Sequence, residues 1–456
     1  MERPQEAESR GREIPIEILQ DILVRLPAKD VLRSSCVSKL WRCIVGDPSF
    51  RKLHGARHVA APSESESLLV SVNREPGMRD EVSVFNLSAD KAMCNVAIPS
   101  GYSLTNICNG FLCLTFHNHD QAPAVVCNPL TGETLEVPKA PPVSVSKEDG
   151  GGDIQLSHRF VLGFSPSTKE YKMFRFSFPA SIYSSGHKTN YTAVYTLGSS
   201  RGWRQDRYLS RFCPRYSLPP PVHIDGNLYV PVVETRHNEY MPAVDAPSGR
   251  AARMLVLNVA TEKHYMYRLP YNYDEGYHPA WKDMLANGFE MNGQMCLAVN
   301  VIYPRRKLQF WVMAPPCELE VKGCDKLYWD MRYCFDLGDD PFYFNTPRAA
   351  WLDNDQILCY RHAEFLYEHD TRGYSSSSND CSMLFDQKVE LPENPFPPRS
   401  SFSSHTWSVY GGYRPSLLSP LTFAVPPSQH EKGKKRQFEH TLLRAIRQSK
   451  NLIKGP

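Results

Sequence analysis

Short apolar runs recur through most of this chain, which limits the folds that it can adopt. Between Leu68 and Ala424 roughly two dozen runs rich in β-branched and aromatic residues follow one another, separated by Gly, Asn, Asp and Pro. Runs of this length, bounded by turn residues, are typical of β-strands. The sequence therefore predicts an all-β domain over residues 68–425.

Two phrases recur in this region. The first is an Asn-Gly or Asp-Gly pair before a strand-like run, at 109–110, 225–226 and 292–293. These pairs favour type I′ hairpin turns, because both central residues of such a turn need a positive φ. The second phrase is a strand, a polar turn, a strand and a proline, at 125–138 and 255–270. Both phrases indicate repeated antiparallel hairpins.

A single β-sandwich cannot bury about two dozen short strands. Radial repetition of four-stranded sheets buries them while leaving few open edges, as in a β-propeller. At about four strands per blade, the runs predict about six blades. Ordinary hairpins in stacked sandwiches are the alternative.

The stretch 14–54 has a helical period instead. Its first apolar residues recur on a wide helical stripe, and these are Ile18, Leu19, Ile22, Leu23 and Leu26. Short helices in a unit of about 40 residues bury too little surface to be stable alone. Surplus apolar surface on such a unit is typical of a partner-binding patch, and a helical cap on the larger domain is the alternative.

Proline and serine positions predict three helices in this stretch. We expect Pro15 as the first helical residue, since its missing N–H would be unpaired there. Pro27 lies just beyond the end of that helix. A second helical turn carries Val31, and a third helix begins near Ser38, a good N-cap, with Trp41 on its apolar surface.

The stretch resembles an F-box, in order and without gaps. The resemblance rests on Ile14-Pro15, Glu17-Ile18-Leu19, Ile22-Leu23, Arg25-Leu26-Pro27, Lys29, Val31-Leu32-Arg33, Val37-Ser38-Lys39-Leu40-Trp41-Arg42 and Pro48-Ser49-Phe50. Ile14 replaces the usual leucine of the family, and Ser38 stands where a cysteine is common. The resemblance implies docking on a Skp-type adaptor and, through it, membership of a cullin–RING ubiquitin ligase. It implies these adaptor contacts: Pro15, Ile18, Leu19, Ile22, Leu23, Leu26, Pro27, Val31, Val37, Leu40 and Trp41.

The all-β region resembles the F-box-associated domain of plant F-box proteins. The residues that carry this resemblance are 109–114 (NGFLCL), 127–133 (CNPLTGE) with Pro138, Gly163-Phe164 and 413–418 (YRPSLL). The resemblance implies a substrate-recognition domain and does not name its substrate.

Charge is unevenly distributed along the chain. The formal net charge of +3 does not indicate a nucleic-acid or membrane partner. From Glu431 onward there are eight Lys or Arg and two acidic residues, so the rest of the chain is mildly acidic. We expect a basic tail with a helix over 426–456. Its candidate nuclear-import signal is the cluster Lys432, Lys434, Lys435 and Arg436. We expect a solvated helix that docks weakly on the propeller, and the nuclear-import signal and a membrane-surface helix are the alternatives.

The cysteines indicate neither a metal site nor a disulfide framework. There are thirteen, an odd number, with no C-x-x-C pair. Cys108 with Cys113, and Cys317 with Cys324, are better interpreted as buried free thiols than as ligand pairs. No apolar run approaches the ~20 residues of a spanning helix, and no secretory signal is seen. We expect a soluble, reduced protein of the cytoplasm, the nucleus or both.

Catalytic motifs are missing as well. The three glycines at 150–152 are followed by neither a lysine nor a helix, as a phosphate-binding loop would be. We expect a non-catalytic protein without metal or cofactor that binds two partners, the adaptor through the F-box and an unidentified target protein through the propeller. The alternatives are an adaptor-bound scaffold or inhibitor that is not a degradation receptor, and a propeller module that binds a small ligand or sugar.

The predicted fold is mainly β with a small N-terminal all-α unit. A disordered lead (1–12) precedes the three-helix F-box (13–54), and a linker (55–67) separates those helices from the strands. The propeller (68–425) and the basic tail with its helix (426–456) follow.

Overall fold

The structure is a computed structural model that describes residues 14–60 and, beyond them, 66–73, 81–86, 91–97, 102–116, 122–143, 156–179, 190–208, 212–213, 220–234, 252–270, 287–291, 293–301, 307–313, 329–336, 349–353, 357–362, 365–370, 387–389 and 407–424. Three predictions lie outside the described residues. They are the lead at 1–12, the tail at 426–456 with its Lys432, Lys434, Lys435 and Arg436 cluster, and the pair Cys317 and Cys324.

Residues 14–60, which we call the helical unit, form four helices where the sequence predicts three: α1 (Ile16–Leu23), α2 (Ala28–Ser34), α3 (Lys39–Gly46) and α4 (Pro48–Ala60). The backbone N–H of Phe50 donates to Asp47 Oδ1 at 2.9 Å, so Asp47 caps α4 and Pro48 is its first residue. The Asp-Pro pair thus ends α3 and also begins α4. Since α4 reaches Ala60, the first part of the predicted linker at 55–67 is helical.

Proline and serine begin the other three helices. Pro15 and Pro27 have nearly the same backbone angles, φ −54° with ψ near 145°, and both are N-cap residues. Pro15 therefore lies one position before the first helical residue, where its carbonyl accepts from the N–H of Ile18 at 3.1 Å. Ser38 is confirmed as an N-cap, since its hydroxyl accepts from the N–H of Trp41 at 3.3 Å.

The described residues between 66 and 424 form 25 strands in six antiparallel sheets. The first sheet contains β1 (Glu66–Asn73), β2 (Glu81–Asn86), β3 (Lys91–Ala97) and the late strand β25 (Trp407–Tyr413). The second contains β4 (Tyr102–Cys108), β5 (Phe111–Phe116), β6 (Val125–Asn128) and β7 (Glu133–Glu136). The third contains β8 (Leu156–Ser165), β9 (Glu170–Pro179), β10 (Asn190–Thr196) and β11 (Arg204–Tyr208).

The other three sheets follow in chain order. The fourth contains β12 (Phe212–Cys213), β13 (Val222–Ile224), β14 (Asn227–Glu234), β15 (Ala252–Asn258) and β16 (His264–Arg268). The fifth contains β17 (Asn287–Met291), β18 (Gln294–Val301), β19 (Lys307–Met313) and β20 (Trp329–Asp336). The sixth contains β21 (Ala349–Asp353), β22 (Ile357–His362), β23 (Phe365–Asp370) and β24 (Gln387–Val389).

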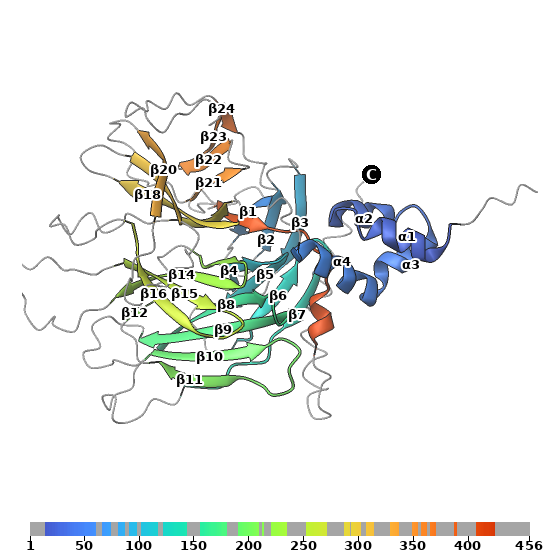
Figure 1. Cartoon of the computed structure of the whole chain (residues 1–456), viewed down its shortest axis with the longest axis horizontal. Coiled ribbons are helices and arrows are strands. Elements are labelled where there is room, and N and C mark those ends of the chain that lie inside the picture. The colour runs from blue at the N-terminus through green and yellow to red at the C-terminus, as the bar shows by residue number, and fades with distance from the viewer. Residues whose placement is uncertain are drawn as a thin grey trace, which may run out of the picture.

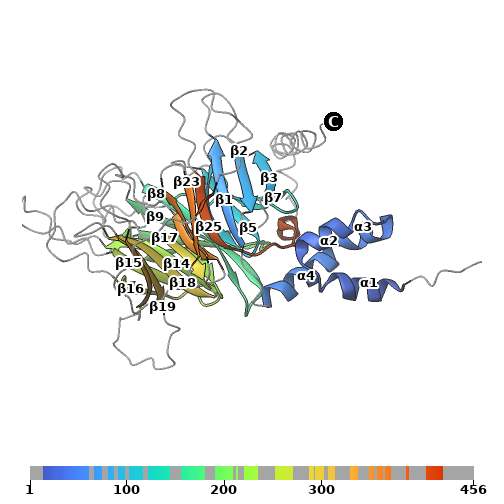
Figure 2. The same ribbon diagram turned by 90° about the horizontal axis from the view of Figure 1, so that it is seen from above.

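The sheets form a closed ring, which confirms the propeller over stacked sandwiches. One strand of each sheet contacts a strand of the next, in the order β25, β4, β8, β13, β17, β21 and back to β25. Closure depends on β25, which pairs antiparallel with β1 in the register Leu69 opposite Val409. The helical unit projects from one side of this ring (Figures 1 and 2).

The predicted hairpin turns are present. Asn109 and Gly110 join β4 to β5 with φ of 45° and 83°, and Asp225 and Gly226 join β13 to β14 with φ of 42° and 78°. These are the two positive angles that a type I′ turn requires. Gly293, in the third predicted turn, has a φ of 75°.

The second repeated motif, a strand, a polar turn, a strand and a proline, has an asparagine at the turn in both copies. Asn128 at the end of β6 accepts through Oδ1 from the N–H of Leu130 at 2.9 Å. Asn258 at the end of β15 accepts in the same way from the N–H of Thr261 at 2.9 Å. In each copy a terminal asparagine closes the turn to the outermost strand of its sheet.

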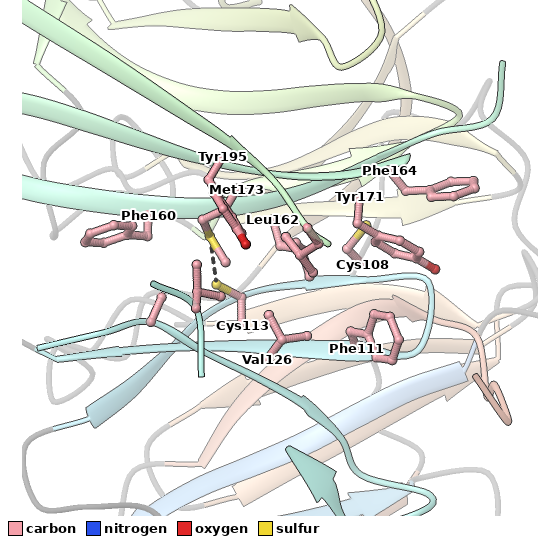
Figure 3. Packing of buried hydrophobic residues seen from close by; sticks show 13 residues of the cluster. Cys108, Phe111, Cys113, Val126, Phe160, Leu162, Phe164, Tyr171, Met173 and Tyr195 are labelled. Carbon is pink, nitrogen blue, oxygen red and sulfur yellow. Dashed lines mark hydrogen bonds between the residues drawn. The ribbon is translucent and has the colours of Figure 1, made fainter. Parts of the chain in front are cut away.

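Apolar side chains fill the space between neighbouring sheets. Figure 3 shows the layer between the second and third sheets, where Phe111 and Cys113 from one sheet face Tyr171 and Met173 from the other. The Sγ atom of Cys113 lies 3.8 Å from the Sδ atom of Met173 (Figure 3). Burial raises the pKa of the Cys113 thiol to about 12, which keeps it protonated and unreactive.

Polar bridges also join the sheets. Asn106 in β4 donates through Nδ2 to the carbonyl of Leu162 in β8 at 2.8 Å and accepts from its N–H at 3.0 Å. Arg414, just after β25, forms a two-pronged ion pair with Glu290 in β17, with Nη1 at 2.9 Å from Oε2. The Glu290 side chain is only 1% exposed. Since these bonds connect the strands nearest the ring centre, they hold the sheets in place.

His223 makes a further bridge, and we expect it to make stability depend on pH. Its Nε2–H donates to the carbonyl of Phe164 at 2.8 Å, and burial lowers the pKa of His223 from 6.5 to about 4. Above pH 6.5 the imidazole is neutral in both the folded and the unfolded chain. As pH falls below 6.5, the unfolded chain binds a proton that the folded chain excludes until about pH 4, so the unfolding free energy falls by about 2 kcal/mol at pH 5.

Urea denaturation at pH 7 and pH 5 measures this loss, with His223→Gln as the comparison. Glutamine can donate to the same carbonyl but does not titrate. The variant should lose less stability than the wild type on acidification. Equal losses in the two proteins would show that His223 does not cause the pH dependence.

Candidate functional site

The helical unit leaves several large apolar side chains exposed. Ile18 and Ile22 lie one turn apart on α1 and are 50% and 45% exposed, and Ile14, just before the N-cap Pro15, is also exposed. Val37 and Leu40, at the start of α3, are exposed as well. We call Ile14, Ile16, Ile18, Ile22, Val37 and Leu40 the exposed apolar set. Side chains of this kind on so small a unit are a candidate docking site.

The predicted adaptor contacts divide into three groups. The exposed ones are Pro15, Ile18, Ile22, Pro27, Val37 and Leu40. Leu26 and Trp41 are partly buried, and Leu19, Leu23 and Val31 are buried in the core of the helical unit. The buried three support the candidate docking site from within and are not accessible to a partner. Ile14 and Ile16 are exposed but were not in the predicted set, although Ile14 continues the four-residue spacing of Ile18 and Ile22.

The helical unit is packed against the propeller, in contrast to the predicted separation by a linker. Its core includes Leu417, which follows β25 in sequence, and Leu130 packs against the same core. Arg51 of α4 forms an ion pair with Glu133 of β7, in which Nη1 lies 2.9 Å from Oε1. The sequence did not show this junction, because residues more than 350 positions apart meet there.

Within α4, His54 holds the helices together. His54 is fully buried, and its Nε2 lies 2.9 Å from the carbonyl oxygen of Leu26, in the connection between α1 and α2. This bond satisfies a carbonyl that has no partner within α1. It links α4 to the segment that follows the helix with Ile18 and Ile22.

A metal site or a reactive thiol would indicate reactive chemistry in the described part of the chain. No group of three or more His, Cys, Asp or Glu there could hold a metal ion. Cys108 and Cys113 are buried free thiols, as predicted, and so are Cys127 and Cys296. Among the described helices, none is both long and apolar enough to cross a membrane.

The fold is thus a small helical unit with exposed apolar side chains, packed against a propeller of six sheets. Comparison with protein families gives the identity of the chain. The F-box domain matches residues 12–53, and the F-box associated beta propeller domain matches residues 62–314, more than half of the chain. The chain therefore belongs to the F-box proteins that carry an F-box associated β-propeller domain.

Relatives in Arabidopsis thaliana support a plant F-box protein. One F-box protein is 31% identical over 227 residues, which cover 47% of this chain and 54% of the relative. A second is 26% identical over 239 residues, which cover 50% of this chain and 52% of the relative. The chain thus spans about half the length of each relative.

Solved structures are more distant. TolB from Acinetobacter baumannii has a TM-score of 0.35 at 9% identity, over 72% of this chain and 67% of TolB. Apo AztD from Citrobacter koseri has a TM-score of 0.31 at 10% identity, over 77% of this chain and 99% of AztD. Similarity at these values supports no inference about this protein.

Proposed function

We propose that this chain is the substrate-recognition subunit of a Skp–cullin–F-box E3 ubiquitin ligase. Its F-box binds a Skp-type adaptor through the exposed apolar set, and its propeller binds a target protein for ubiquitination. The observation that carries the proposal is the exposure of Ile18 and Ile22 on an F-box that is packed against a propeller.

In this role the chain is a non-catalytic receptor. Holding the target near a ubiquitin-charged enzyme raises the effective concentration of the target's lysines there. The junction of Arg51 with Glu133 supports such a role, because a firm connection limits the volume that the bound target explores. The proposal places the chain in the cytoplasm, the nucleus or both, which imaging of the tagged protein tests.

Reconstitution tests the assembly. The full chain, mixed with a Skp-type adaptor, a cullin and a RING subunit, should elute from size exclusion as one complex that contains all four proteins. Failure of the chain to bind the adaptor would contradict the proposal. Adaptor binding without cullin would instead favour the scaffold or inhibitor alternative.

A further inference from the structure

Residues 413–419, which we call the C-terminal strap, leave the ring-closing strand β25 and cross to the helical unit before the short helix η4 (Pro420–Phe423). Tyr413 and Leu417 in the strap are fully buried, but in different cores. Tyr413 packs with side chains of the second sheet, including Leu104 and Leu112. Leu417 packs with the core of the helical unit. One segment therefore contributes side chains to both parts of the protein.

The propeller holds the strap at several points. Asn128 at the end of β6 is buried, and its Nδ2 donates to the carbonyls of Ser416 at 2.7 Å and Leu418 at 2.8 Å. Gly110 lies so close to the strap that a Cβ there would be 2.6 Å from the carbonyl oxygen of Arg414. Two bonds and a close backbone contact thus fix the strap on the second sheet.

Leu417 belongs to a small core that the helical unit supplies almost entirely. The unit supplies eight buried apolar residues to this core: Leu19, Leu23, Val24, Ala28, Val31, Ile44, Val45 and Phe50. A unit of this size rarely folds without outside help. Leu417 is the fully buried strap residue in this core, and α4 comes close to the strap at Gly55, where a Cβ would lie 3.4 Å from the Cβ of Leu418.

Helix α1 connects this core to the docking surface. Leu19 and Leu23 on its inner side share the cluster with Leu417, while Ile18 and Ile22 on its outer side belong to the exposed apolar set. Removing Leu417 would open a cavity in the core on which the inner side of α1 packs.

We infer that the C-terminal strap is a structural part of the F-box, so that the exposed apolar set is presented in a fixed arrangement only when β25 has closed the propeller ring. The consequence for adaptor affinity rests on the proposed function, whereas the consequence for helix stability does not. Leu417 is thus a positioning residue, which acts on the adaptor through α1.

Two matched substitutions in the full chain test this inference. Leu417→Ala removes a fully buried side chain, and Leu421→Ala makes the same change four residues later, where the leucine is 51% exposed. Hydrogen–deuterium exchange is measured for peptides from α1 and, as an internal reference, from β9. Leu417→Ala should speed exchange in α1 about thirtyfold or more, with β9 unchanged. Leu421→Ala should change neither.

Adaptor affinity, measured by titration calorimetry, is the second readout. Leu417→Ala should weaken binding by at least tenfold, and Leu421→Ala should leave it unchanged. Unchanged α1 exchange in Leu417→Ala would overturn the inference. If the wild type does not bind the adaptor, the proposed function fails, and α1 exchange still decides the role of the strap.

A third variant addresses the case in which Leu417→Ala does not fold. Asn128→Asp keeps the Oδ1 acceptor for the Leu130 N–H and removes the Nδ2 donor of the two bonds to the strap. It should also speed α1 exchange, by less than Leu417→Ala does. No increase in α1 exchange in this variant would contradict the inference.

Discussion

Replacing Ile18 and Ile22 together with glutamate is expected to reduce adaptor affinity at least a hundredfold. Both side chains are about half exposed and lie one turn apart on α1. Apolar anchors at the centre of an interface each contribute about 2 kcal/mol or more, and a charge in the same place must also be desolvated. Because neither residue is in the core, the melting temperature should change little.

Leu53→Glu is the matched control for this pair. Leu53 is 58% exposed on α4 of the same helical unit, and it is not among the predicted adaptor contacts. Titration of the adaptor into each variant measures the effect. If Leu53→Glu weakens binding as much as the double substitution does, the docking surface does not centre on α1.

The second large effect is expected at the ion pair between Arg414 and Glu290. Arg414→Met should destabilise the propeller by about 3–5 kcal/mol, because it leaves the Glu290 carboxylate buried without its partner. Adding Glu290→Gln should restore much of the loss, since the charge that lacks a partner is then removed. Urea denaturation of the single and double variants measures both changes.

Arg204→Met is the control for this experiment. Arg204 is 58% exposed, and its partner Glu262 keeps a second ion pair with Lys172 at 2.8 Å. Its loss should cost less than about 1 kcal/mol. If Arg414→Met costs no more than Arg204→Met, the buried pair does not hold the ring together.

The class of fold could be predicted from the sequence because local signals repeat. Asn109-Gly110 and Asp225-Gly226 specify hairpins by their backbone preferences alone, and these turns formed as predicted. The number of sheets followed from the number of strand-like runs. Each of these signals depends on residues that are close together in the chain.

Contacts between distant residues could not be predicted in this way. Asn106 is fully buried in β4, although a polar residue between Thr105 and Ile107 does not suggest a core position. Its amide satisfies both backbone groups of Leu162 in the next sheet, a partner that only the folded ring brings near. Leu417 is similar, since nothing in the sequence around it indicates that it packs among helices.

The division of the F-box residues into core and surface was also beyond the sequence. Ile18, Leu19, Ile22 and Leu23 are all apolar, so the pattern does not show which pair faces inward. The structure buries the two leucines and exposes the two isoleucines. That assignment depends on where α2, α3 and α4 pack.

Because β25 is synthesised long after β1, the strand pair that closes the ring can form only late in synthesis. The ribosome makes residues 14–60 first, and the roughly 350 residues that separate them from Leu417 take tens of seconds at about 5–20 residues per second. Until then the edge of β1 has no partner, and the helical core lacks its last side chain. Under the proposed function, nascent chains would therefore present an incomplete docking unit, and the adaptor would bind finished molecules in preference.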